Sequence, residues 1–282
     1  AGTRPGAGDP RRLVEIAVQV EEAGLDGVIV ADHVLIGRRT DRYPWGDFPF
    51  PPEAPWLEPL TLLTAVAART ERLVLTTGIL VVPLRPAPLL AKQVATLDLL
   101  SGGRFELGAG TGWQAEEFEA QGLDPDARGR LLTDTIAACR ALWRDAPASF
   151  SSATLSFDQV WSEPRPTRPG GPPVLFSGTL TPRNIRRIVD LGDGWIPIMG
   201  ATIDDVAAGT AQLRAALADA GRDPDELLVR MPLPIVRGDL AATLAGADEA
   251  AAAGATEGSV PGAIIGDARL AELRAATPPD GT

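Results

Sequence analysis

The chain has a single histidine, His33, which directly follows Asp32 at the end of the apolar segment DGVIVADHV. Imidazole changes its charge near neutral pH, so a histidine at a strand end could accept a proton from a reacting oxygen or donate one to it. The carboxyl ends of the strands carry the active site in parallel barrels. A histidine in a loop can also be merely solvated. We predict that His33 is catalytic.

A second candidate is the run of alternating glycines Gly108, Gly110 and Gly112 in RFELGAGTGW. A dinucleotide-binding fingerprint requires G-x-G-x-x-G, and Trp113 occupies the position of its third glycine, so a Rossmann site is disfavoured. Glycines at a strand end still let a flat ring or a phosphate approach the backbone. A ligand-binding turn and a plain strand-to-helix turn remain equal alternatives on this pattern.

A third candidate is the segment LFSGTLTPRNIRR, in which Ser177, Gly178 and Thr179 end an apolar run. Pro182 suits the first turn of a helix. Three arginines follow, at positions 183, 186 and 187. Hydroxyls and free backbone N–H groups at a helix N-terminus form an anion site, whereas the alternative is a solvated basic helix face.

These candidates must be positioned by the alternation of apolar strands and amphipathic helices along the chain. We expect strands in 26–34, 72–82, 104–110, 172–178, 194–198, 227–236 and 258–266. We expect helices in 13–23, 60–69, 88–100, 128–144, 183–191, from 202 onwards, in 240–253 and at the C-terminal end. Thr202 and Asp205 have the spacing of a capping box.

Continuous apolar strands separated by helices indicate a parallel sheet with helices outside. The rhythm predicts a (β/α)8 TIM barrel with one of its eight strands unaccounted for, formed as a single domain over 1–282. Residues 1–12 hold no strand-like run, so the first strand is expected to be missing or atypical. A doubly wound open sheet is the alternative.

Two insertions of about 34–59 and 145–173 interrupt this alternation. Loops of this length are usually functional lids or disordered segments. The first gathers aromatic residues, namely Tyr43, Trp45, Phe48, Phe50 and Trp56. We predict that this loop caps the substrate, with Tyr43, Trp45 and Trp56 in contact with it; an oligomer contact or a loop packed on its own barrel is the alternative.

The composition excludes several other classes of protein. A net charge of −11 opposes nucleic-acid binding, and no stretch approaches the roughly 18 apolar residues that span a bilayer. With no signal-peptide pattern in the opening residues, we expect a cytoplasmic protein. One Cys and one His cannot form a zinc set. Cys139 lies on the apolar face of a helix and is expected to be buried rather than nucleophilic.

The strand-end Asp-His, the block TTGILVVPLRPAPLLAKQVATLDLLSGGRFELGAGTGWQAEEFEAQGL and the segment SGTLTPRNIRRIVDLGDGW together resemble the bacterial luciferase-like flavin and deazaflavin oxidoreductases. Within that superfamily, GTGW-x-x-EEFE and the Asp-His pair are more similar to the branch that uses coenzyme F420 than to the branch that uses FMN. The resemblance implies a TIM barrel with the cofactor ring across the carboxyl ends of its strands.

The resemblance also implies roles for individual residues. Asp32 and His33 match positions that approach the ring, and Gly110, Thr111, Gly112 and Trp113 match the loop beside it. Ser177, Gly178 and Thr179, with Arg183, match the site of the phosphate tail. A non-prolyl cis peptide found behind the ring in this superfamily maps to Gly78, Ile79 and Leu80.

The sequence departs from the superfamily at one catalytic position. Sugar-phosphate dehydrogenases of the superfamily carry a catalytic glutamate where this chain has Trp113. Glu116, one turn further along, is our substitute candidate, although Glu116, Glu117 and Glu119 could instead form a solvated helix face.

The predicted function is hydride transfer between F420 and a small organic substrate. An FMN-dependent monooxygenase fed by a separate flavin reductase, or a non-catalytic cofactor-binding barrel, are the alternatives. We expect no nucleic-acid or membrane partner. We do expect a homodimer.

Overall fold

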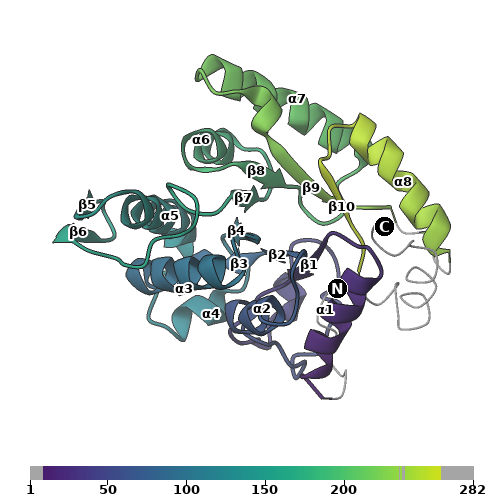
Figure 1. Ribbon diagram of the computed structural model, residues 1–282, viewed down its shortest axis with the longest axis horizontal. Helices are drawn as coiled ribbons and strands as arrows, with labels where there is room; N and C mark the ends of the chain where they lie inside the picture. The colour runs from purple at the N-terminus through teal and green to yellow at the C-terminus, as the bar shows by residue number, and fades with distance from the viewer. Residues whose placement is uncertain (1–8, 235, 237–238, 262–282) are drawn as a thin grey trace.

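The computed structural model describes residues 9–234, 236 and 239–261 (Figure 1). The main strands are β1 (Gly27–Val30), β2 (Val74–Thr77), β3 (Leu80–Val81), β4 (Phe105–Gly110), β7 (Val174–Ser177), β8 (Gly194–Ile196), β9 (Leu228–Pro232) and β10 (Glu257–Ser259). The helices are α1 (Arg12–Glu22), α2 (Pro59–Ala67), α3 (Ala87–Leu100), α4 (Ala115–Glu119), α5 (Arg128–Arg144), α6 (Pro182–Leu191), α7 (Ile203–Asp219) and α8 (Leu240–Ala252).

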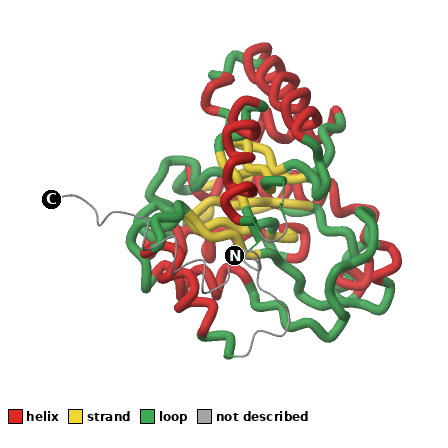
Figure 2. Tube along the Cα trace, turned by 90° about the vertical axis from the view of Figure 1, so that its right-hand side faces the viewer, coloured by secondary structure: helices red, strands yellow, loops and turns green. Residues whose placement is uncertain are grey.

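The strands of this core form one parallel sheet in the order β1-β2-β4-β7-β8-β9-β10, and β3 pairs with β4. The sheet lies in the middle of the molecule, with the helices outside it (Figure 2). Because all neighbouring strands of this sheet pair in parallel, the carboxyl ends of the strands meet at one edge. The fold is the predicted α/β class, with a parallel sheet curled into a half-barrel.

The sheet does not close within the described residues, where β1 pairs with β2 alone and β10 with β9 alone. No strand precedes α1 from residue 9 onwards, as the strand count predicted. The expected helix at the C-terminal end lies outside the described residues. The expected strand over 72–82 is divided into β2 and β3 at the peptide bond between Gly78 and Ile79, which is cis, as the resemblance implied.

Apolar helix faces and continuous apolar strands build the core, in which Leu63, Leu75, Leu90, Phe105 and Phe176 are fully buried. The predicted capping box is present, because Thr202 accepts from the Asp205 N–H while the Asp205 carboxylate accepts from the Thr202 N–H. Cys139 is buried, as predicted, and burial raises the pKa of its thiol, so it is not poised as a nucleophile.

The two insertions have different structures. Residues 145–173 contain an antiparallel hairpin of β5 (Ala148–Ser151) and β6 (Ser156–Val160), which lies beside α5 at the periphery of Figure 1. None of its residues lines the cavity described below, so the expectation of a lid or a disordered segment is wrong there. Residues 34–58 run from β1 to α2 over the strand ends and are called the lid from here on. Among the described helices, none is long and apolar enough to cross a membrane.

Candidate active site

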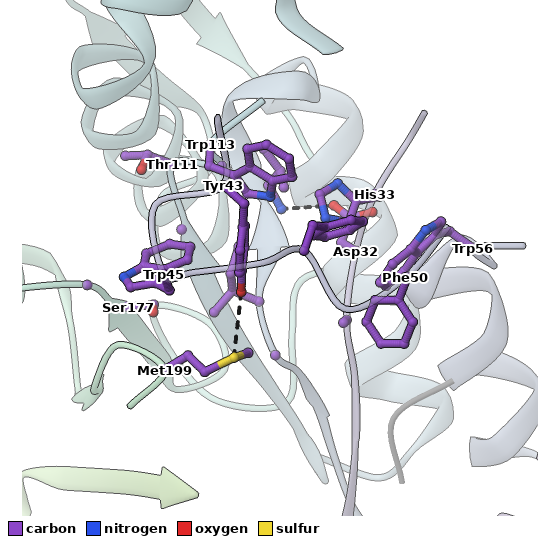
Figure 3. Close-up of a pocket in the computed structure, with 18 of the residues that line it drawn as sticks. Asp32, His33, Tyr43, Trp45, Phe50, Trp56, Thr111, Trp113, Ser177 and Met199 are labelled. Carbon is purple, nitrogen blue, oxygen red and sulfur yellow. Dashed lines mark hydrogen bonds between the residues drawn. The ribbon is translucent and has the colours of Figure 1, made fainter. Parts of the chain in front are cut away.

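A cavity of about 250 Å³ opens at the carboxyl ends of β1, β2, β4 and β7 (Figure 3). Its lining comprises Ala31, Asp32, His33, Tyr43, Trp45, Phe48, Pro49, Phe50, Trp56, Gly78, Ile79, Val81, Gly110, Thr111, Gly112, Trp113, Ser177, Gly178 and Met199. The three segments that the sequence singled out therefore converge on one opening, covered by the lid. Its walls are mostly apolar, with a small number of polar groups, as in most small-molecule sites.

His33 is oriented by Glu117 of α4, whose side chain is completely buried. The His33 Nδ1 lies 3.2 Å from Glu117 Oε2. Because a carboxylate can only accept, Nδ1 carries the hydrogen of this bond, which leaves Nε2 as the basic nitrogen of the neutral ring. No protein group among the described residues bonds to Nε2. His33 therefore has the orientation of a general base or acid.

The backbone that follows His33 is fixed by the same helix. Glu117 Oε1 accepts a hydrogen bond from the Val34 N–H at 2.8 Å. Gln114, the N-cap residue of α4, accepts from the Gly37 N–H at 3.0 Å and donates to the Gly37 carbonyl at 3.2 Å. Two buried polar side chains of α4 therefore hold the first residues of the lid against the glycine loop.

Asp32 points away from solvent into an ion pair with Arg85. Its Oδ2 accepts from Arg85 Nη1 at 2.7 Å and from the Val81 N–H at 2.8 Å, and its Oδ1 accepts from Arg85 Nη2 at 3.1 Å. Arg85 also donates to Glu58, the N-cap residue of α2, at 2.9 Å. Asp32, Arg85 and Glu58 thus tie both ends of the lid to the segment after β3.

The ion pairs of Arg85 with Asp32 and Glu58 shift the pKa values of Arg85 and Glu58. Burial alone would raise the pKa of Glu58, but hydrogen bonds from Thr61 and Arg85 lower it below its usual range. Burial alone would lower the pKa of Arg85, and the Asp32 and Glu58 carboxylates raise it instead. Both groups are therefore held in their charged forms.

The lid aromatic residues pack on one another and on the glycine loop. Tyr43 is central, with ring centroids 5.2 Å from Trp45, 5.3 Å from Phe48 and 5.2 Å from Trp113. His33 lies edge-on to Trp56, at 4.8 Å. Edge-to-face packing of this kind is favourable beyond the area it buries. A continuous aromatic network therefore covers the imidazole.

The lid also reaches across the cavity to the loop that follows β8. The Tyr43 hydroxyl donates a hydrogen bond to the Sδ of Met199 at 3.6 Å (Figure 3). Met199 lies in the loop that follows β8. Burial raises the pKa of the Tyr43 hydroxyl, so this group remains a donor. Thioether sulfur is a weak acceptor. The contact holds the lid closed less firmly than the bonds at its two ends.

The turn after β7 is stabilised by Asn184, whose amide donates to the carbonyls of Ser177 and Thr179 at 3.4 and 3.2 Å. Of the three arginines of α6, Arg187 is buried and bonds to Thr133 and to the Gly129 carbonyl. Arg187 therefore joins α6 to α5 and is not available as an anion site. Arg183 and Arg186 are exposed.

Most of the predicted site residues line the cavity, and four do not. Asp32, His33, Tyr43, Trp45, Trp56, Gly78, Ile79, Gly110, Thr111, Gly112, Trp113, Ser177 and Gly178 all line the cavity. Leu80, Glu116, Thr179 and Arg183 do not line it. The proposal that the glutamates of α4 form a solvated face is wrong for Glu117, and the residue facing His33 is Glu117 rather than Glu116.

Sequence reasoning missed four residues that shape the site: Arg85, Gln114, Glu117 and Met199. The signal for Glu117 was its place next to Phe118, since both lie on the buried face of the short helix α4. Arg85 carried no local signal, because its partner Asp32 is 53 positions away. Within the residues that the structure describes, no group of three or more His, Cys, Asp and Glu is arranged to hold a metal ion.

A curled parallel sheet with an oriented histidine and an apolar cavity at its strand ends has the architecture of a barrel enzyme. The chain belongs to the luciferase-like monooxygenase family, whose sequence profile matches residues 1–271.

The similar proteins include F420-dependent dehydrogenases and a monooxygenase. An F420-dependent glucose-6-phosphate dehydrogenase of Amycolatopsis mediterranei is 33% identical over 68% of this chain and 54% of its own length, so the chain spans about half of that enzyme. The solved monooxygenase RslO1 from Streptomyces bottropensis has a TM-score of 0.69 at 23% identity, over 93% of this chain and 76% of the other. An F420-dependent secondary alcohol dehydrogenase in complex with an F420-acetone adduct has a TM-score of 0.68 at 21% identity, over 83% and 67%. At these identities the two structures establish the fold alone.

Proposed function

We propose that the chain is an oxidoreductase that transfers a hydride between coenzyme F420 and an organic alcohol or carbonyl compound. The observation that carries the proposal is the His33–Glu117 pair, which presents an imidazole with its free nitrogen at an apolar cavity. The 33% identity to an F420-dependent dehydrogenase supports F420 as the cofactor. The solved F420-dependent secondary alcohol dehydrogenase shares the fold, which is compatible with this reaction type.

The residues present fit a flat tricyclic ring. Gly110 and Ile79 form adjacent parts of the cavity wall, and a Cβ at Gly110 would lie 2.6 Å from Ile79 Cδ1. The space that this Cβ would take is filled by the Ile79 side chain, so Gly110 lets Ile79 pack closely and form an apolar wall against which a planar ring can lie. The volume of about 250 Å³ is below the roughly 300–1,000 Å³ of complete small-molecule sites. It therefore suits the ring, with the tail of the cofactor outside.

Ser177 and Gly178 form the polar edge of the cavity, and Thr179 and Arg183 come next along the chain. Ser177 and Gly178 would hold the start of the cofactor tail, and the exposed guanidinium of Arg183 would meet its phosphate. A guanidinium pairs well with phosphate oxygens. The net charge of −11 makes such local cations necessary for an anionic cofactor.

When bound, the deazaflavin would accept or donate one hydride, that is, one proton together with two electrons. In the oxidising direction, His33 Nε2 takes the hydroxyl proton of the alcohol while the hydride leaves the carbinol carbon, so that the O–H and C–H bonds break and the C=O bond forms. Glu117 holds the imidazole through Nδ1 and stabilises the imidazolium. In the reducing direction, the imidazolium returns the proton to the carbonyl oxygen.

Titration of the purified protein with oxidised F420 and, separately, with FMN tests the cofactor. Quenching of tryptophan fluorescence reports both, since Trp45, Trp56 and Trp113 line the cavity. The proposal expects saturable binding of F420 that is tighter than that of FMN. Binding of FMN alone would contradict it.

Replacement of His33 by Ala tests its role in proton transfer. We expect turnover to fall by about 10²–10⁴-fold, with the dissociation constant of F420 nearly unchanged, because the ring contacts backbone and apolar groups. A steady-state assay of F420 absorbance together with the fluorescence titration separates the two effects. If the variant and the parent protein have equal turnover, His33 takes no part in proton transfer.

An FMN-dependent monooxygenase is the second candidate, favoured by the aromatic lid that keeps water from the cavity. In that reaction dioxygen places one atom in the substrate and the other in water, with two electrons from reduced flavin delivered by a separate reductase. The structural similarity to a monooxygenase is compatible with it. Oxygen consumption coupled to substrate hydroxylation in the presence of reduced FMN would favour this candidate.

A further inference from the structure

The chemistry of the cavity wall restricts the charge of the substrate. Among the described residues that line the cavity there is no Lys or Arg. The charge of Asp32 is already matched by Arg85. The three lid arginines, Arg38, Arg39 and Arg42, do not line the cavity, and Arg39 is paired with Asp41. A phosphate placed beneath the lid would have no cation to pair with, and an unpaired buried charge is strongly unfavourable.

The cavity wall around His33 carries aromatic side chains in place of charged ones. The chain has six Trp, one Tyr and seven Phe, and five of these lie between positions 43 and 56. With Trp113 they pack mostly edge to face, at centroid distances such as 5.2 Å between Tyr43 and Trp113 and 5.3 Å between Phe50 and Trp56. The rings contact one another rather than enclosing an empty cage, which disfavours a quaternary ammonium ligand. One more flat ring would extend the same packing.

The mouth of the cavity carries apolar surface that water still touches. Trp45 is 43% exposed and Met199 is 62% exposed, and both line the cavity. Trp45 lies beside the Tyr43 ring, and Met199 lies at the Tyr43 hydroxyl (Figure 3). A ligand that covers this apolar surface removes it from water, which is favourable. A hydrated sugar would bring hydroxyls that find few partners there.

We infer that the substrate is an uncharged aromatic ketone or the corresponding alcohol, and not a phosphorylated sugar. This inference rests on the proposed function for the reaction but concerns the ligand that the lid selects. The aromatic ring packs against Tyr43, Trp45 and Phe48. The oxygen lies toward His33, because no described residue bonds to its Nε2. The buried indole N–H of Trp56, whose ring contacts His33, also lacks a partner among the described residues and could donate to the same oxygen.

Isothermal titration calorimetry with three ligands tests the inference, in the free protein and in the F420-loaded protein. Acetophenone is the aromatic ketone, cyclohexyl methyl ketone is its saturated counterpart of the same skeleton, and glucose 6-phosphate is the phosphorylated sugar. We expect acetophenone to bind about 3–10-fold more tightly than cyclohexyl methyl ketone. We expect no saturable heat with glucose 6-phosphate.

Two variants connect the preference to the lid. Trp45→Ala is expected to weaken acetophenone binding by about 3–10-fold, while Trp45→Phe retains most of the affinity. Trp161→Ala is the matched control, because Trp161 is 68% exposed and does not line the cavity. If all three variants bind acetophenone like the parent protein, the lid does not contact the ring and the inference fails.

The outcomes separate this inference from the proposed function. If F420 binds but glucose 6-phosphate binds more tightly than acetophenone, or the two ketones bind equally, the inference is overturned and the cofactor assignment stands. If F420 does not bind but free protein retains the preference for acetophenone, the proposed function fails and the inference stands. Absence of acetophenone binding to both forms overturns the inference.

Discussion

The protonation of one side chain decides the chemistry of this site. A histidine beside a buried carboxylate must keep a hydrogen on the nitrogen that faces it, and in this chain that nitrogen is Nδ1. Glu117 bonds at the same time to the Val34 N–H. It therefore sets both the tautomer of the imidazole and the path of the backbone that carries it, as supporting carboxylates do in other catalytic sites.

The presence of one histidine in the chain allows a direct measurement of this tautomer. Selective ¹⁵N-histidine labelling gives a spectrum of His33 alone. At alkaline pH we expect the neutral ring to carry its hydrogen on Nδ1. In Glu117→Gln the side-chain oxygen can remain on the Val34 N–H, and the amide NH2 then faces Nδ1, so the hydrogen is expected on Nε2.

Glu119→Gln is the matched control for this spectrum, since Glu119 is exposed at the end of the same helix. Its spectrum is expected to equal that of the parent protein. An Nε2–H tautomer in the parent protein would contradict the assigned role of Glu117. A spectrum that does not change in Glu117→Gln would contradict it as well.

At the scale of elements, β4 is built so closely against β2 that one of its glycines has a steric role. A Cβ at Gly108 would lie 1.9 Å from the carbonyl oxygen of Thr77. This carbonyl belongs to the backbone of β2, which cannot rotate away as a side chain can. Gly108 therefore permits the contact between the strands that carry the cis peptide and the glycine loop.

Gly108→Ala is expected to lower the free energy of unfolding by about 3 kcal/mol, because the added methyl must displace backbone. Gly122→Ala is a suitable control: its Cβ would meet nothing within 4 Å, and its φ of +69° costs about 1 kcal/mol. Urea denaturation followed by circular dichroism measures both. Equal losses in the two variants would show that conformation rather than contact determines the effect.

The lid is an element fixed at its ends, and its second end depends on the charge of Glu58. Hydrogen bonds lower the pKa of Glu58 in the folded protein, so its stabilising contribution is present above the ordinary pKa of about 4.5 and is lost as the pH falls through the lowered value. Glu58→Gln is therefore expected to destabilise the protein at pH 7 and to leave it unchanged in strong acid.

The size of this effect is limited by solvent. The Glu58 side chain is 39% exposed, so screening reduces the expected loss to less than about 1 kcal/mol. Thermal unfolding at pH 7 and pH 3, at low and high salt, measures it. A loss that is equal at the two pH values would indicate that the amide breaks the helix cap on Thr61 instead of the ion pair.

The sequence predicted the elements better than the contacts between them. Apolar periodicity and caps located β1, β4, β7, the helices α1 to α3 and the helices α5 to α8 within a few residues, because these signals are local. The short helix α4 was not among the expected elements. The hairpin β5–β6 was missed, since its strands are short and its side chains only partly buried. The partners of Asp32 and His33 come from segments 53 and 84 positions away, and such pairs leave no local pattern.

At the scale of the whole molecule, a polar link crosses the interior of the curled sheet. Arg230 of β9 donates to Glu106 of β4 at 2.6 Å, although β7 and β8 lie between these strands in the sheet. Arg230 also bonds to Glu257 of β10, and Thr76 of β2 donates to Glu106 at 3.4 Å. The link joins four strands and so holds the sheet in its curved form.

The energetics of this link are dominated by burial. Burial raises the pKa of Glu106, Arg230 lowers it less, and the nearby Glu257 carboxylate adds to the rise. A carboxyl with a raised pKa stabilises the fold in its protonated form, fully below its ordinary pKa of about 4.5, and this stabilisation is lost as the pH rises through the raised value.

Glutamine imitates the protonated carboxyl at every pH. Glu106→Gln is therefore expected to equal the parent protein in stability near pH 4 and to exceed it near pH 7, as measured by urea denaturation at both values. Glu119→Gln, at an exposed position, is expected to match the parent at both. If Glu106→Gln is instead the less stable protein at pH 7, the attraction of Arg230 outweighs the burial of the carboxylate, and the curvature of the sheet depends on an ion pair rather than on hydrogen bonding.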